Sequence, residues 1–211
     1  SQVLTVTIAA VNDAPIAATD LTGETSEGVS IAIQLSASDV DGDNLTYSLL
    51  SDATNGSITI EGQLATYVPT DYYYGADEFT FQVSDGELTD NASVSLFVNA
   101  VNDAPVLAAL DNVSFDEDSS GGVTLSATDI DGDDLAYSVT AGTDIVATLE
   151  GTDLSFSAPA DFNGTENFTV SVTDGDLTDS QVLTVTIAAV NDAPIAGLGL
   201  SGITDENISV S

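Results

Sequence analysis

Apolar and polar residues alternate along most of this chain with a period of two. Three of the clearest runs are Ile31–Ala37, Phe79–Ser84 and Leu183–Ile187. Successive side chains of a β-strand point to opposite faces, so this pattern predicts strands that are buried on one face only. No helical periodicity extends beyond a turn or two. The chain is therefore predicted to be all-β.

The sequence also repeats itself at a long interval. SQVLTVTIAAVNDAPIA occurs unchanged at residues 1–17 and 180–196, and the pentapeptide VNDAP starts at Val11, Val101 and Val190. The interval is thus 90 and then 89 residues, and we expect the one-residue difference in a loop near Tyr73–Gly75. Repeats of this length are whole domains. About seven alternating runs per repeat, separated by Gly, Asp and Asn, predict a two-layer β-sandwich.

The repeats define a domain organisation. Residues 16–105 and 106–194 are predicted to be complete domains, residues 1–15 the last strand and linker of a truncated domain, and residues 195–211 the first strand of another. A proline near the end of each linker, at positions 15, 105 and 194, fixes the backbone and stiffens the joint. This organisation is typical of a window cut from a longer tandem array.

Charge changes the picture more than any other compositional feature. The 211 residues include 35 Asp and Glu but no Lys, Arg or His, which gives a net charge of −35. Self-repulsion on this scale opposes compaction, so compensating cations must come from solution. Ca²⁺ prefers carboxylate and carbonyl oxygens. Because many of the acids recur in short clusters, the sequence favours calcium sites over general acidity.

The same composition excludes several classes of function. Without Lys or Arg the chain is not expected to bind nucleic acid or anionic membrane surfaces, and no apolar run is long enough for membrane insertion by this segment. Without Cys there is no disulfide or thiolate metal site. Nucleophile–base pairs that need His, Lys or Cys are absent. A carboxylate pair of the glycosidase type cannot be told from the metal clusters, so we expect no enzyme.

Acidic landmarks keep the same order in both repeats. A glutamate (Glu27, Glu117) precedes an Asp-x-Asp-Gly-Asp motif (Asp39, Asp41 and Asp43; Asp129, Asp131 and Asp133), then an Asp-Gly (Asp85, Asp174), then Asn-Asp-Ala-Pro. In this order and spacing the chain resembles bacterial cadherin-like repeats (tandem-95 or VCBS-like) of large surface adhesins and extracellular fibres. The resemblance implies seven-stranded Greek-key β-sandwiches of the cadherin and immunoglobulin type, stacked end to end.

The resemblance further implies Ca²⁺ at the junctions between domains. At the first junction the implied ligands are Asn12, Asp13, Asp39, Asp41 and Asp85. At the second they are Glu27, Asp71 or Asp77, Asn102, Asp103, Asp129, Asp131 and Asp174, and at the third Glu117, Asp161 or Glu166, Asn191 and Asp192. Asp43 and Asp133 complete the two Asp-rich motifs. The familiar Leu-Asp-Arg-Glu segment is replaced by Pro69-Thr-Asp71, which leaves the number of ions open.

Other interpretations of these motifs remain. An EF-hand is excluded, because its sixth position would be Asn44 or Asp134 instead of glycine and its twelfth Leu50 or Thr140 instead of glutamate. The Asp-rich motifs can also be plain acidic turns between strands. The Asp-Gly pairs are hairpin signals in their own right.

We therefore expect a calcium-binding structural segment of a secreted or cell-surface adhesin, stalk or filament. Its partners would be neighbouring repeats and other copies of the same chain, through lateral or head-to-tail association. The first alternative is a carbohydrate-binding module for surface polysaccharide, with the aromatic cluster Tyr72–Tyr74 as the candidate contact, although packing of one ring under its loop is the simpler explanation. The second alternative is acidity as an adaptation to high salt, without defined sites.

Overall fold

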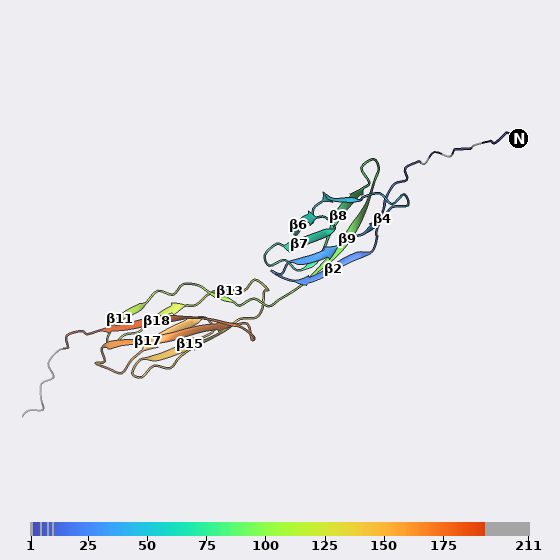
Figure 1. Ribbon diagram of the computed structural model, residues 1–211. Helices are drawn as coiled ribbons and strands as arrows, with labels where there is room; N and C mark the ends of the chain where they lie inside the picture. Colours follow the sequence, from blue (N-terminus) through green and yellow to red (C-terminus); the bar gives the residue numbers. More distant parts are fainter. Residues whose placement is uncertain (1, 5, 8, 10, 193–211) are drawn as a thin grey trace, which may run out of the picture. The chain divides into compact units, whose positions relative to one another are not determined.

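The computed structural model describes residues 2–4, 6–7, 9 and 11–192. The chain divides into two compact units between Asn102 and Asp103, and all regular structure in the described part is β (Figure 1). No helix in that part is long and apolar enough to cross a membrane. The strand predicted within residues 195–211 lies outside the described residues.

Nine strands build the first domain. They are β1 (Ile16–Ala17), β2 (Leu21–Ser26), β3 (Ile31–Gln34), β4 (Ala37–Ser38), β5 (Thr46–Ser51), β6 (Gly56–Glu61), β7 (Leu64–Pro69), β8 (Gly75–Ser84) and β9 (Thr89–Asn99). One sheet has the order β2-β9-β8-β5, the other β3-β7-β6, and β1 pairs with β4. β2 runs parallel to β9, and the other paired strands are antiparallel.

The second domain repeats this topology strand for strand. Its strands are β10 (Val106–Leu107), β11 (Val113–Asp116), β12 (Gly121–Thr124), β13 (Ala127–Thr128), β14 (Ala136–Val139), β15 (Val146–Glu150), β16 (Asp153–Ser157), β17 (Gly164–Thr173) and β18 (Thr178–Ala188). The sheets are β11-β18-β17-β14 and β12-β16-β15, with β10 paired to β13. In the first domain β1 and β2 form one interrupted strand, and so do β3 and β4; in the second domain the same holds for β10 and β11 and for β12 and β13. Counted in this way, each domain has seven strands. The predicted seven-stranded sandwich is confirmed.

Each domain has its own core between its two sheets. The alternating runs supply it as predicted: Phe79, Phe81 and Val83 are fully buried, and so are Leu183 and Val185. In the first domain Tyr67 lies in this core, and in the second Phe156 packs against Phe168 with ring centroids 5.0 Å apart. Burial on one face only explains why the sequence shows a period of two.

The one-residue difference between the repeats does not lie where the sequence suggested. Leu49 and Val139 hold equivalent positions 90 residues apart, because they pair with Phe81 and Val170, which are themselves equivalent. From β6 onward the offset is 89. The extra residue of the first domain therefore falls inside β5, at the register shift between Leu49 and Ser51. A bulge absorbs it, and the loop at Tyr73–Gly75 has the same length in both domains.

Candidate metal centres

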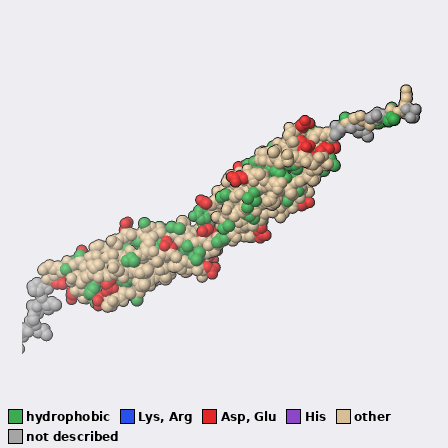
Figure 2. All heavy atoms as spheres, in the orientation of Figure 1, with side chains coloured by type: hydrophobic (Ala, Val, Ile, Leu, Met, Phe, Trp, Pro, Cys, Tyr) green, Lys and Arg blue, Asp and Glu red, His purple; other side chains and the backbone are tan. Residues whose placement is uncertain are grey.

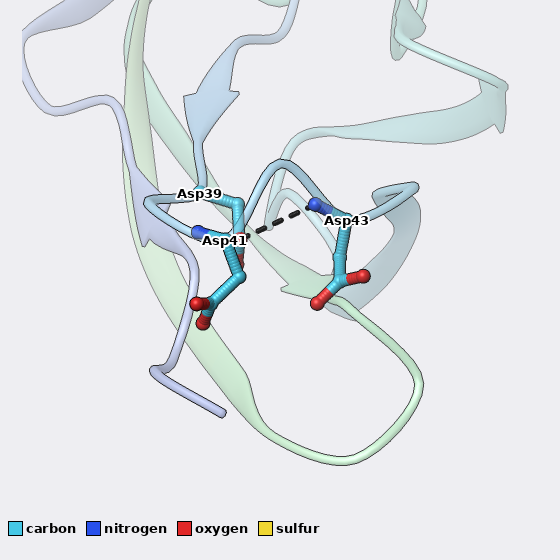
Figure 3. A group of neighbouring side chains, drawn as sticks. All are labelled: Asp39, Asp41 and Asp43. Carbon is cyan, nitrogen blue, oxygen red and sulfur yellow. Dashed lines mark hydrogen bonds between the residues drawn. The ribbon is translucent and has the colours of Figure 1, made fainter. Parts of the chain in front are cut away.

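The Asp-rich loop after β4 is organised around one carboxylate. Asp39 Oδ1 accepts hydrogen bonds from the backbone N–H groups of Asp41 (2.9 Å), Gly42 (3.0 Å) and Asp43 (3.3 Å). Gly42 has a φ of 79°, which glycine adopts without steric cost. The three Asp side chains consequently point to the same side of the loop (Figure 3).

This loop brings three carboxylates together in a chain that has no basic side chain to neutralise them. One carboxylate oxygen from each of Asp39, Asp41 and Asp43 lies within 4.8 Å of the others. Asp39 Oδ2 is buried and has no hydrogen-bond partner. A buried acceptor without a partner is costly, and a chain without Lys, Arg or His offers no cation of its own. A bound metal ion would satisfy this oxygen.

The linker that precedes the first domain is tied to the same end of the sandwich. Asn12 donates from Nδ2 to Asp85 Oδ2 (2.9 Å), and the N–H of Asp13 donates to Asp41 Oδ2 (2.8 Å). Hydrogen bonds from the amides of Leu88 and Glu87, and from Asn12, hold the pKa of Asp85 below its usual range, so this carboxylate stays charged. We call this region, with residues 12–13, 39–43 and 85, the N-proximal end; acidic groups gather there in Figure 2.

The second domain builds its N-proximal end in the same way. Asp129 Oδ1 accepts from the amides of Asp131 (2.9 Å), Gly132 (3.1 Å) and Asp133 (3.5 Å), and Asp129 Oδ2 is buried without a hydrogen-bond partner. The N–H of Asp103 donates to Asp131 Oδ2 (2.8 Å).

Electrostatics confirm that charge is concentrated at this end of the second domain. Partial loss of hydration and then the charges of Asp129, Asp131, Asp174 and Asp134 raise the pKa of Asp133. Oxygens of Asp129, Asp131 and Asp133 again lie within 4.8 Å of one another. Asp174 also fixes its own hairpin, since its Oδ1 accepts from the amides of Asp176 (2.7 Å) and Leu177 (2.6 Å). Asn102, the remaining ligand implied at this linker, is the last residue of the first unit.

A third cluster lies at the opposite end of the second domain, where β18 ends. Oxygens of Asp118, Asp161 and Asp192 fall within 4.8 Å of one another. Asp118 Oδ1 accepts from the N–H of Asp161 (3.2 Å). The charge of Asp161, then loss of hydration, then Glu117 and Asp118 raise the pKa of Asp192. We call this the C-proximal end; ten-residue β17 separates it from Asp174 by about 30 Å.

Glu117 is buried and holds the chain segment that leads to the C-proximal cluster. Its side chain is only 8% exposed, and its Oε1 accepts from the N–H of Val190 (2.5 Å) while Oε2 accepts from Asn163 Nδ2 (3.4 Å). Its backbone N–H donates to Ala188 (2.9 Å). Glu117 thus fixes the path by which the chain leaves β18. Asn191 uses its side-chain amide locally, donating to the carbonyl of Asp192 (3.3 Å).

Sequence reasoning missed Asp118. Asp118 lies in the acidic stretch Asp116-Glu117-Asp118, which was a signal for it. A comparison of the two repeats does not single it out, because the equivalent residue in the first domain is Gly28. Both residues have left-handed backbone, with φ of 62° and 66°. The corrected offset also pairs Asp161 with Tyr72, both at φ 60°, so Asp71 is not the counterpart of Asp161 as the sequence suggested.

The first domain consequently has a sparser C-proximal end. Glu27 donates its backbone N–H to Asn99 (3.0 Å), as Glu117 does to Ala188, and its Oε1 is buried without a hydrogen-bond partner. Asp71 is exposed, and among the described residues neither it nor Glu27 belongs to a group of three clustered acids.

Two of the candidate ligands hold loops in place instead of joining a cluster. Asp77 accepts from the amides of Thr54 (3.0 Å) and Asn55 (2.9 Å) and from the buried Tyr67 hydroxyl (3.0 Å). Glu166, its counterpart, accepts from three consecutive amides in the β14–β15 loop, at Thr143, Asp144 and Ile145. Burial raises the pKa of Glu166, but these amides outweigh it and lower the pKa overall. Of the alternatives Asp71 or Asp77 and Asp161 or Glu166, Asp71 and Asp161 therefore remain as the candidate ligands at the C-proximal ends.

The three tyrosines of the cluster Tyr72–Tyr74 have different environments. Tyr73 packs against the core of the first domain and donates its hydroxyl to the carbonyl of Ala76 (2.5 Å). This agrees with the expectation that one ring lies under the loop. Tyr72 and Tyr74 are more than half exposed.

Comparison with known proteins identifies the repeats. A sequence model of the bacterial Ig domain matches residues 12–97 and 102–186. Chitinase A of Pseudoalteromonas piscicida is 28% identical over 151 residues, which are 70% of this chain and 18% of that protein. The chain therefore spans less than a fifth of this curated relative.

Solved structures show the same fold in cadherins. Human protocadherin-24 EC1-2 has a TM-score of 0.54 at 18% identity, covering 84% of this chain and all of that one. Human mucin-like protocadherin EC1-2 has a TM-score of 0.50 at 22% identity, covering 83% and 98%. With two matched copies and this fold, the chain belongs to the bacterial Ig domain family and consists of tandem, cadherin-like β-sandwich repeats.

Proposed function

We propose that this chain is a calcium-binding structural segment of a secreted or cell-surface protein, in which Ca²⁺ fixes each linker to the domain that follows it. One observation carries the proposal: the central carboxylate of each N-proximal loop has one oxygen bonded to three amides and the other buried without a donor. In a loop that served only as a turn, the amide bonds to the first oxygen would be sufficient, and burial of the second oxygen without a donor would serve no purpose.

The donor set fits a hard divalent cation. The clustered side chains offer carboxylate oxygens only, and the chain has no His or Cys, which Zn²⁺ and softer metals prefer. Ca²⁺ takes six to eight oxygens in flexible geometry at 2.3–2.6 Å. Asp39, Asp41 and Asp43 would hold it in the first domain and Asp129, Asp131 and Asp133 in the second, with linker residues and water completing the shell.

Calcium would act on the linkers through contacts that already exist inside each unit. The N–H of Asp13 bonds Asp41, and the N–H of Asp103 bonds Asp131. Without a cation, mutual repulsion between the carboxylates opposes this anchoring. A bound cation removes the repulsion, so the linker loses freedom. A tandem array of such domains would become a semi-rigid spacer, with a mechanical and non-catalytic role.

Substitution of the central carboxylate tests the proposal. In Asp39→Asn and Asp129→Asn the side-chain oxygen still accepts the three amide bonds, so the turn is kept while the charged, buried oxygen is lost. Calcium titration of the full chain by calorimetry should show one N-proximal site lost in each variant and both in the double variant. Glu61→Gln and Glu150→Gln, which change exposed strand-end acids, are the matched controls. Equal binding by all variants would refute defined sites and favour general screening.

A carbohydrate-binding role is the second candidate, favoured by the exposed rings of Tyr72 and Tyr74 and by the similarity to a chitinase. Two exposed aromatic rings on one loop can stack on sugar rings. Retention of the chain on insoluble chitin, abolished in Tyr72→Ala/Tyr74→Ala and unchanged in Asp129→Asn, would support this role. No retention of the native chain on chitin would count against it.

A further inference from the structure

An open groove lies on the first domain, beside the loop that connects β5 to β6. It has a volume of about 640 Å³, which falls within the range of small-molecule sites. β5 pairs with β8 only between Thr80 and Ser84, so the preceding part of β8 forms one wall of the groove and the loop forms the other. The lining includes Asp52, Thr54 and Asn55 of the loop, Asp77 and Glu78 of β8, and Ser95 of β9.

Most polar side chains in this groove are free to meet a ligand. Asp52 uses only Oδ1, which accepts from two amides at 2.9 Å, so Oδ2 has no partner. Four further side chains make no hydrogen bond to any described part of the chain; they are Thr54, Asn55, Glu78 and Ser95. The groove therefore presents two carboxylates, two hydroxyls and an amide that the fold does not use.

The corresponding surface of the second domain is closed by its own side chains. Thr184 Oγ1 donates to Asn167 Oδ1 (2.9 Å), and Thr165 Oγ1 donates to Thr186 Oγ1 (3.3 Å). The counterparts in the first domain, in the same order, are Ser95, Glu78, Ala76 and Phe97. The second domain also has alanine, at position 141, where the first has Asp52. The free acidic groove is thus a property of the first domain and not of the repeat.

We propose that this groove binds a glycan that carries ammonium groups, such as a polymer of glucosamine. The argument is charge complementarity: Asp52, Asp77 and Glu78 line the groove, and the chain has no Lys, Arg or His to neutralise them. Ammonium groups of the sugar would pair with Asp52 and Glu78, and its hydroxyls would bond the neutral polar side chains. Sulfated or uronic glycans would be repelled.

Phe97 adds an apolar surface beside the groove. Its ring is 50% exposed, and it lies directly opposite Ala76, which lines the groove. An exposed aromatic ring can pack against the C–H face of a sugar. The second domain has Thr186 at this position, so it lacks the ring as well as the acids.

The backbone at the open edge of β8 favours a glycan over a peptide. The carbonyl of Ala76 accepts from the Tyr73 hydroxyl (2.5 Å), and the N–H of Glu78 donates to Asp77 Oδ1 (2.9 Å). A peptide that joined the sheet as an extra strand would need these backbone groups. A ligand that brings its own amines and hydroxyls needs only the side chains that are free.

Calorimetric titration of the full chain with a β-1,4-linked glucosamine hexamer tests the proposal. Asp52→Asn and Glu78→Gln keep an acceptor oxygen but lose the charge, and each should weaken binding about tenfold. Phe97→Thr changes no charge and should weaken binding about fivefold. Glu61→Gln/Glu150→Gln removes two charges at exposed positions outside the groove and should bind as the native chain does.

Three outcomes would overturn the proposal. Equal affinity of the groove variants and the Glu61→Gln/Glu150→Gln control would show that the net charge alone attracts the hexamer. Equal affinity of the native chain for the fully N-acetylated hexamer would show that ammonium groups are not recognised. Equal affinity for a hexamer of lysine would show that the sugar contributes nothing.

The glycan and calcium proposals fail independently. Asp39→Asn/Asp129→Asn, which should lose calcium at both N-proximal ends, changes no residue that lines the groove and should bind the glucosamine hexamer as the native chain does. Loss of hexamer binding in this double variant would contradict a separate glycan site.

Discussion

The two domains are nearly identical at their N-proximal ends and different at their C-proximal ends. Asp39 and Asp129 accept the same three amide bonds, and Asp41 and Asp131 both accept a linker amide at 2.8 Å. At the other end, Asp118 and Asp161 of the second domain stand where the first domain has Gly28 and Tyr72.

The difference separates what the fold requires from what a site requires. All four of these C-proximal residues have left-handed backbone, with φ between 60° and 66°. The turn needs a residue that tolerates this conformation, and glycine does so at the lowest cost. Asp118 and Asp161 are therefore not demanded by the backbone. The acidic cluster at this end is a property of the second domain, whereas the N-proximal cluster is built into both.

The largest effect is expected when the calcium site at the N-proximal end of one domain is removed and the site of the other domain is kept. A site at 100 times its Kd in calcium stabilises the folded domain by about 2.7 kcal/mol. Asp39→Asn should remove this gain from the first domain alone, and Asp129→Asn from the second alone. Amide hydrogen exchange at β8 and at β17 reports each domain separately. A loss shared equally by both domains in either single variant would contradict separate sites.

The fold was predictable from the sequence because one-sided burial leaves a period of two in every long strand. The Asp-rich loops were predictable as well, since both repeats carry the same residues at the same spacing. The C-proximal cluster was not. It depends on Asp118, which only one repeat has, and on an offset set by a bulge within β5 that no single residue predicts. Nor does the sequence distinguish a carboxylate that anchors a loop, such as Glu166, from one left for a metal.

A smaller effect is expected inside the cores, where the domains anchor the same loop differently. Tyr67 donates its hydroxyl to Asp77, whereas the second domain has Phe156 and relies on Glu166 alone. Burial, followed by the hydrogen bond to Asp77, raises the pKa of Tyr67, so the hydroxyl remains a donor at neutral pH. Tyr67→Phe should cost about 1 kcal/mol in urea unfolding. Tyr74→Phe, at an exposed ring, should cost nothing measurable; equal losses would contradict the anchoring role.

A still smaller effect should appear at the C-proximal ends. Asp118→Asn keeps a residue that tolerates left-handed backbone and an acceptor for the N–H of Asp161, but removes one charge. In calcium-free buffer the second domain should gain about 0.5 kcal/mol, because repulsion with Asp161 and Asp192 is relieved. Gly28→Asp should add no calcium-dependent stability to the first domain, since Tyr72 takes the place of the acid Asp161 there. Calcium stabilisation of that variant would show that one acid suffices.

The smallest effect concerns pH and follows from two carboxyls of the second domain. Loss of hydration and then neighbouring acids raise the pKa of Asp133, and the charge of Asp161 and then loss of hydration raise the pKa of Asp192. Near these pKa values the folded state therefore binds more protons than the unfolded state. Stability of the calcium-free second domain should therefore gain from these groups as pH falls from 7 toward the raised pKa values. Calcium competes with the same protons, so the difference in Tm between calcium-containing and calcium-free samples should narrow over this range. Asp133→Asn should flatten the calcium-free profile, whereas Glu150→Gln, at an exposed position away from the clusters, should not. A calcium-dependent difference that stays constant from pH 7 to pH 4 would show that these carboxyls do not bind the ion.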